Sequence, residues 1–165
     1  MAQYDFLFDH HVVSGLYPVA DAFDTSMTTD FISLAKYNRI TFFVHTGNAT
    51  GNTANGAVTL LASASAAGTS TTALAFKYRV CASSTSVDTW GALTDATSSG
   101  FSMTAGDNYL YAIEITADDA CAQIDGKPFV ALKVTESSND PIVAGVLAVL
   151  SDPRYPQAVP LTAIA

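Results

Sequence analysis

Residues 39–45 have the sequence RITFFVH and alternate between polar and apolar positions along most of their length. Successive side chains of a β-strand point to opposite faces, so Ile40, Phe42 and Val44 would share one face. The same period recurs in residues 57–63, 74–81, 108–116 and 128–136. Repeated alternation of this kind is typical of antiparallel sheets that bury one face in a core.

The alternation predicts which side chains enter that core. The inward set is Val58, Leu60 and Ala62; Leu74, Phe76, Tyr78 and Val80; Tyr109, Tyr111, Ile113 and Ile115; and Val130, Leu132 and Val134. Residues rich in Gly, Asn, Asp, Ser and Thr lie between the alternating segments, and they are turn formers. No helical period of useful length appears. The sequence therefore predicts an all-β fold, an antiparallel, jelly-roll-like β-sandwich.

Residues 142–150, IVAGVLAVL, differ from the other segments because they are apolar at every position. A strand that is apolar on both faces is either central in its sheet or covered on one face by another chain. We expect this segment to meet one of those two conditions.

The two ends of the chain differ from its middle, and we divide the chain into three parts. Residues 1–30 form an N-terminal arm and lead-in, residues 31–151 the β-sandwich, and residues 152–165 a C-terminal arm. The first residues are apolar but lie far in sequence from any strand that could pair with them. The last residues include Pro153, Pro156 and Pro160. Proline lacks a backbone donor and favours extended chain.

We expect the arms to contact neighbouring subunits, and in particular the C-terminal segment to bind between subunits rather than fold onto its own core. The residues predicted to make subunit or capsid contacts are Phe6, Phe8, Arg154, Tyr155, Val159 and Leu161. They offer apolar area together with residue types that are enriched at interfaces. The alternative, that both ends tie down on their own domain, stays open at this stage.

Composition restricts the partners of this chain. Charged residues make up 13% of the sequence, against about 25% in typical soluble domains, and the net charge is −8. Lys and Arg together number 7 and form no basic run, so neither free nucleic acid nor a membrane is an expected partner. A surface this poor in charge indicates that part of it is covered by other protein.

The sequence contains no constellation that points to catalysis, a metal or a cofactor. Glu114 and Glu136 are its two glutamates, and the alternation places both on outward strand faces. His10 and His11 are adjacent, so on a strand they would point in opposite directions and bind one ion poorly. Three aspartates, at positions 118, 119 and 125, are interpreted as a solvated turn. We expect no enzyme activity and no cofactor.

Two other residue sets need an interpretation. Cys81 and Cys121 are expected to be free thiols, because nothing near the start resembles a secretion signal. Trp90, Tyr109 and Tyr111 are the candidates for a sugar-stacking platform, although the alternation favours burial of the two tyrosines. A carbohydrate-binding or adhesin-like module is therefore the alternative function.

Segments throughout the chain carry a resemblance to a known family. They are residues 19–27 (VADAFDTSM), 33–37 (SLAKY), 40–47 (ITFFVHTG), 73–80 (ALAFKYRV), 88–90 (DTW), 138–142 (SNDPI) and 150–155 (LSDPRY). Their overall pattern is similar to small structural proteins of tailed bacteriophages that are often encoded near the major capsid protein. The similarity is one of pattern, since none of these segments is a chemical motif.

The resemblance implies a decoration (cement) protein. Such a protein is a β-sandwich that sits on the outside of an icosahedral capsid, bound to the major capsid protein and to copies of itself as a homotrimer. It would be made in the cytoplasm of the bacterial host and end on the virion surface. The carbohydrate-binding module of a head fibre or tail remains the alternative.

Overall fold

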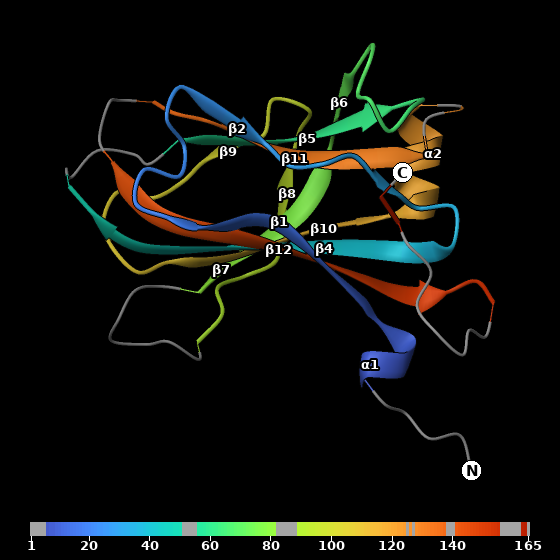
Figure 1. Cartoon of the computed structure of the whole chain (residues 1–165), viewed down its shortest axis with the longest axis horizontal. Helices are drawn as coiled ribbons and strands as arrows, with labels where there is room; N and C mark the ends of the chain where they lie inside the picture. Colours follow the sequence, from blue (N-terminus) through green and yellow to red (C-terminus); the bar gives the residue numbers. More distant parts are fainter. Residues whose placement is uncertain are drawn as a thin grey trace.

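The computed structural model describes residues 6–50, 56–81, 89–124, 126, 128–137, 141–155 and 163–164. These residues form two antiparallel sheets that stack in two layers, with one short helix at an end of the stack and another projecting below it (Figure 1). The predicted all-β, antiparallel sandwich is confirmed.

Sheet A has six strands. In spatial order they are β1 (His11–Val19), β12 (Ile142–Pro153), β4 (Tyr37–Ala49), β10 (Leu110–Thr116), β7 (Phe76–Cys81) and β8 (Thr94–Ala96). Every neighbouring pair is antiparallel. The first and last strands of this order, β1 and β8, are the sheet's edges.

Sheet B lies over one face of sheet A. Its main path is β2 (Ser26–Thr28), β11 (Phe129–Thr135), β5 (Ala57–Ser63) and β6 (Thr72–Leu74). Two short strands join it, β3 (Ile32–Ser33) on β11 and β9 (Phe101–Ser102) on β5. The helices are α1 (Phe6–Asp9) and α2 (Ala117–Gln123), and α2 closes one end of the sandwich (Figure 1).

The core lies between the sheets and contains the side chains that the alternation selects. Ile40, Phe42 and Val44 are all fully buried, as are their counterparts on β5 and β11. On β7, Tyr78 and Val80 are only half-buried, while Lys77 and Arg79 point outward as expected. Burial of this apolar area, at roughly 25 cal/mol per Å², is the main favourable term for the fold.

The wholly apolar segment at residues 142–150 is an interior strand, because β12 pairs with β1 on one side and β4 on the other. Its inward side chains, such as Val146 and Leu150, are buried. Its outward side chains are not, since Val143 is 42% and Leu147 is 50% exposed. The strand therefore has an interior position and an outer face that the described residues leave open.

The N-terminal arm expected over residues 1–30 is in large part a component of the sandwich. Residues His11–Val19 form edge strand β1, paired with β12, and Ser26–Thr28 form β2, paired with β11. Phe23 and Met27 also enter the core. The partner strands lie more than a hundred residues later in the chain, so their pairing leaves no local signal.

The C-terminal segment also departs from the expectation. Residues 152–153 complete β12, and Ala163 is 5% exposed within the protein's own core. The Ser33 N–H donates to the Ala163 carbonyl oxygen over 2.8 Å, and Ile164 packs beside it. The prediction that this segment avoids its own core is therefore wrong at residues 163–164. Val159 and Leu161 lie outside the described residues.

The acidic turn expected near Asp118 is the first turn of α2. The Thr116 hydroxyl accepts a hydrogen bond from the Asp119 N–H at 3.0 Å and donates to the Asp119 carboxylate at 2.8 Å. Thr116 is thus the N-cap of the helix, and the acidic residues lie favourably in its first turn. The threonine followed three residues later by an acidic residue was the available sequence signal.

We predict that the last residues stabilise the fold. A chain that ends at residue 162 loses the buried Ala163 side chain and the hydrogen bond to Ser33. Its free energy of unfolding in urea should fall by about 1–3 kcal/mol. A chain that lacks only Ala165 is the control and should match the full chain. Equal stability of all three chains would contradict the docking of this segment.

We predict that Tyr111 makes stability depend on alkaline pH. Burial raises the pKa of this phenol, whose oxygen accepts a hydrogen bond from the Thr104 N–H at 3.0 Å. The folded state thus keeps the proton above pH 10, where the unfolded chain releases it. This contribution is complete below about pH 10 and is lost as the pH rises through the raised pKa.

Tyr111→Phe tests this dependence. It should lower the free energy of unfolding by about 0.5–1.5 kcal/mol at neutral pH, because the Thr104 N–H loses this acceptor. It should also flatten the decline above pH 10, measured by urea denaturation across that range. Parallel curves for the two proteins above pH 10 would refute the assignment to Tyr111.

Candidate functional site

The outer face of sheet A is the broad surface that sheet B does not cover, and the strand register arranges its side chains in rows. One row runs through Val12, Val149, Thr41, Glu114, Lys77 and Asp95. The next runs through Ser14, Leu147, Phe43, Ala112 and Arg79. Large apolar side chains concentrate on β1, β12 and β4, which we call the apolar half. Charged side chains concentrate on β10, β7 and β8, the charged half, together with Arg39 of β4 and Asp152 of β12.

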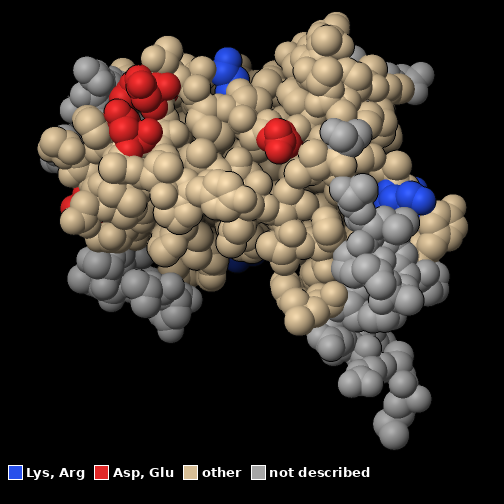
Figure 2. Space-filling model, in the orientation of Figure 1, with Lys and Arg blue, Asp and Glu red and all other residues tan. Residues whose placement is uncertain are grey.

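The apolar half of this face carries most of the exposed large hydrophobic side chains. Of ten such residues in the described part of the chain, seven belong to α1, β1 and β12. They are Phe6, Leu7, Val12, Tyr17, Val19, Val143 and Leu147. Val19 lies opposite the buried Ala144, so the other six mark the outer face. Figure 2, which looks onto the side of β1 and β2, also shows few charged side chains among the described residues. Exposed apolar residues are common singly, but a contiguous group marks an interaction surface.

A hollow of about 790 Å³ lies in the apolar half, and we name it the trench. Two register shifts in β1, between Ser14 and Val19, raise Tyr17 and Pro18 as one wall. Gly145 contributes no side chain to the floor, where a Cβ would stand 3.2 Å from the Pro18 ring. Further lining comes from Leu16, Phe43, His45, Leu110, Val143 and Leu147.

Helix α1 lies on the same face, at the opposite end of β12. The Phe6 ring stacks on His10 with centroids 4.4 Å apart, and both line a smaller hollow of about 300 Å³ with Phe43 and Val149. Phe6 is 55% and Leu7 is 74% exposed, so α1 presents an apolar projection. We name Phe6 and Leu7 the knob.

The charged half of the face is organised by ion pairs. Lys77 Nζ is 2.5 Å from an Asp95 oxygen, and this hydrogen bond is the main cause that raises the pKa of Lys77. Arg39 lies 3.8 Å from Glu114 and 3.5 Å from Asp152. The Thr41 hydroxyl also donates to Glu114 at 3.2 Å. Because these pairs are solvent-exposed, each adds little to stability, but together they balance the charge of the face.

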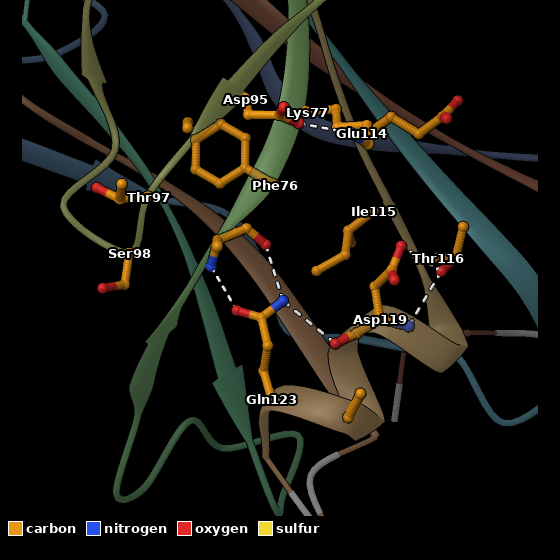
Figure 3. Close-up of a pocket in the computed structure, with 13 residues that line it drawn as sticks. Phe76, Lys77, Asp95, Thr97, Ser98, Glu114, Ile115, Thr116, Asp119 and Gln123 are labelled. Atoms are coloured by element: carbon orange, nitrogen blue, oxygen red, sulfur yellow. Dashed lines mark hydrogen bonds and ion pairs between the residues drawn. The ribbon is translucent and has the colours of Figure 1, made fainter.

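A groove of about 830 Å³ runs beside α2, over a floor that includes the buried Phe76 and Ile115 (Figure 3). Gln123 reaches across from α2. Its amide accepts from the Ala75 N–H at 2.6 Å and donates to the Ala75 carbonyl at 2.9 Å. Ala75 is the point where the chain passes from β6 of sheet B to β7 of sheet A. Gln123 therefore serves as a structural partner for the crossing backbone.

The sugar-stacking platform is not assembled. Tyr111 is fully buried, and Tyr109 is half-buried with its ring centroid 6.0 Å from that of Tyr111. Trp90 is 37% exposed and its backbone bridges to Cys81. The interpretation as a core residue is confirmed for Tyr111, whereas Tyr109 is only partly buried against the core. With Tyr111 buried, the three rings do not form one open surface. Neither Cys81, which is buried, nor Cys121, which is exposed, forms a disulfide.

Some of the predicted contact residues are on the surface. Phe6 is half-exposed, Tyr155 is 65% exposed, and Arg154 is exposed while its backbone N–H binds the Lys36 carbonyl. The Phe8 side chain, like Val159 and Leu161, lies outside the described residues. The predicted contact residues did not include Tyr17, Val143 and Leu147, whose apolar side chains are exposed on the same face. The apolar positions on both faces of residues 142–150 were the signal for the last two.

Within the described ranges, no three or more His, Cys, Asp and Glu residues are grouped so as to hold a metal ion. Among the described helices, none has the length and apolar character needed to cross a membrane.

Comparisons with known proteins give a structural likeness but no family. No protein-family model matches the chain. No curated protein matches its sequence. Among solved structures, the SPBc2 prophage-derived protein YomS is similar with a TM-score of 0.40 and 15% sequence identity. The alignment covers 85% of this chain and 93% of that chain.

We predict that Gln123 stabilises the fold and does not serve to bind a ligand. Gln123→Ala removes both hydrogen bonds to Ala75 and should lower the free energy of unfolding by about 1–2 kcal/mol. Ser98→Ala, in the opposite wall of the same groove, is the control and should leave stability unchanged. Urea denaturation followed by circular dichroism measures both. An unchanged midpoint for Gln123→Ala would contradict this role.

Proposed function

We propose that this chain is a structural virion protein, a decoration (cement) protein that binds the outside of an icosahedral bacteriophage capsid. Its partners would be the major capsid protein and further copies of itself, and its contacts would bridge and stabilise subunits. The observation that supports this best is the concentration of exposed apolar side chains on α1, β1 and β12. The phage context comes from the resemblance in the sequence.

The energetics of that surface favour a protein partner. A half-exposed leucine or valine still offers apolar area to a partner, at roughly 25 cal/mol per Å² removed from water. Val12, Val149 and Leu147 are neighbours across β1 and β12, so one flat partner can cover all of them. A β-sheet face that holds such residues can pack against another sheet or helix with little rearrangement of either backbone.

Several polar side chains of this surface are held in hydrogen bonds and ion pairs within the protein, which supports a structural rather than a catalytic function. Glu114 is held by Arg39 and Thr41, and Lys77 is held by Asp95. Gln123 is bound to the Ala75 backbone on the floor side of the groove. A catalytic acid or base must be free to contact its substrate, whereas these side chains are held by one another.

The charge of the chain also suits a shell surface. With a net charge of −8 and few cations, the protein gains nothing from free nucleic acid, and apolar contact is what it can offer a protein shell. Assembly rather than enzymatic activity is therefore our proposal for its role.

The proposal predicts the copy number in purified particles. Gel densitometry or quantitative mass spectrometry should find the chain at a level comparable to the major capsid protein, or a simple fraction of it. Particles that lack the chain should lose their DNA at a lower temperature than complete particles. A few copies per particle would instead indicate a portal, connector or tail component.

A further inference from the structure

We propose that the trench on the outer face of sheet A receives the knob on α1 of a second copy of this chain, and that the contact is reciprocal. This inference rests on the proposed structural function, names the partner of the same surface, and replaces the homotrimer implied by the resemblance with a two-fold pair. Its elements are the exposed Phe6 and Leu7 and the hollow lined by Tyr17, Val143 and Leu147.

The positions of the two features permit reciprocity. Phe6 lines a hollow with Val149, whereas the trench lies over Val143 and Leu147, further along β12. Phe43 of β4 lines both hollows and so lies between them. At about 3.3 Å per residue, Val149 and Val143 are roughly 20 Å apart along β12. A two-fold axis in the plane of the face, perpendicular to the strands and near Leu147, exchanges these two ends. Each knob then meets the trench of the other copy, so that every contact occurs twice.

The two surfaces match in size and chemistry. The trench, at about 790 Å³, is large enough for bulky apolar side chains, and its walls are mainly aliphatic and aromatic. The knob consists of one aromatic and one aliphatic side chain that its own chain leaves mostly in water. Aromatic and aliphatic anchors in a desolvated pocket are the contacts that contribute most to association.

The charge of the face favours a copy of the same chain. Its strands present three of the seven basic residues, Arg39, Lys77 and Arg79, and three of the fifteen acidic residues, Asp95, Glu114 and Asp152. The remaining sequence holds four basic and twelve acidic residues. The net charge of −8 therefore comes entirely from residues outside these strands. A patch that meets itself across a two-fold axis must not carry a net charge of its own. In a chain this acidic, the outer strand face of sheet A meets that condition.

The edge of sheet A is a poorer place for two copies to join. Strand β1 is interrupted by two register shifts, and Pro18 has no N–H to donate. Bulges and proline are the devices by which exposed strands avoid edge-to-edge pairing. The association we propose is therefore face to face, through side chains.

Light scattering coupled to size-exclusion chromatography tests the pairing with the purified full chain. The wild type should have the mass of two chains at high concentration and approach one chain on dilution. Leu7→Asp removes the knob, while Leu147→Asp and Val143→Asp each place a charge in the trench. Each variant should weaken the pair at least tenfold in Kd and keep a native circular dichroism spectrum.

The matched control is Leu93→Asp. Leu93 is 53% exposed, nearly the same as Leu147, but it precedes β8 at the far edge of the sheet from β1. It should pair like the wild type. A mixture of Leu7→Asp and Leu147→Asp chains should recover pairing, because each mixed pair keeps one intact knob and one intact trench that can meet.

The outcomes separate this inference from the proposed function. A wild-type chain that stays monomeric, a mass of three chains, or variants that pair like the wild type would each overturn the reciprocal contact. Failure of the mixed chains to pair better than either variant alone would do the same. Copy number in particles is measured independently, so a monomeric chain that still coats particles leaves the structural function intact.

Discussion

The antiparallel pairing of β4 with β12 is the interaction on which the rest of the structure depends. It runs from Tyr37 opposite Pro153 to Ala49 opposite Ile142, joining the first third of the chain to its last part. Each strand then holds a further neighbour, since β10 pairs with β4 and β1 pairs with β12. Without this pairing, β1 and β12 would separate from the other four strands of sheet A, and the core beneath would be exposed to solvent.

The same pairing produces both the core and the exposed surface. Because side chains alternate, burial of Val146 and Leu150 on the inner face requires Val143 and Leu147 to stand on the outer face. Polar residues there would have made β12 an ordinary strand of a water-facing sheet. Apolar residues at both sets of positions retain the fold and also leave an interaction surface, which agrees with the low charge of the whole sequence.

The two halves of the outer face differ in what they can do. On β10, β7 and β8 the charged side chains satisfy one another, and the groove beside α2 is held together by Gln123 and by the cap at Thr116. On β1, β12 and β4 the large exposed side chains are mainly apolar, and Pro18 packs closely over Gly145, which has no side chain. Recognition by shape and apolar contact is therefore favoured on the second half.

The sequence by itself determined the fold class and most of the core. Period-2 alternation needs only local information, and it identified Ile40, Phe42 and Val44 together with the inward residues of β5, β10 and β11. It also marked residues 142–150 as unusual and so indicated part of the candidate surface. Tyr111 was correctly favoured as a core residue because its polar neighbours in the sequence revealed the face on which it lies.

Only the tertiary structure decided what becomes of the two ends and where the trench forms. Strand β1 has its partner at the far end of the chain, and Ala163 meets Ser33 after a similar separation. Such contacts depend on which strands become neighbours, and a local period carries no record of that choice. The trench likewise requires the β1 register shifts to lie beside Gly145, a coincidence of two distant segments that arises only when the sheet is assembled.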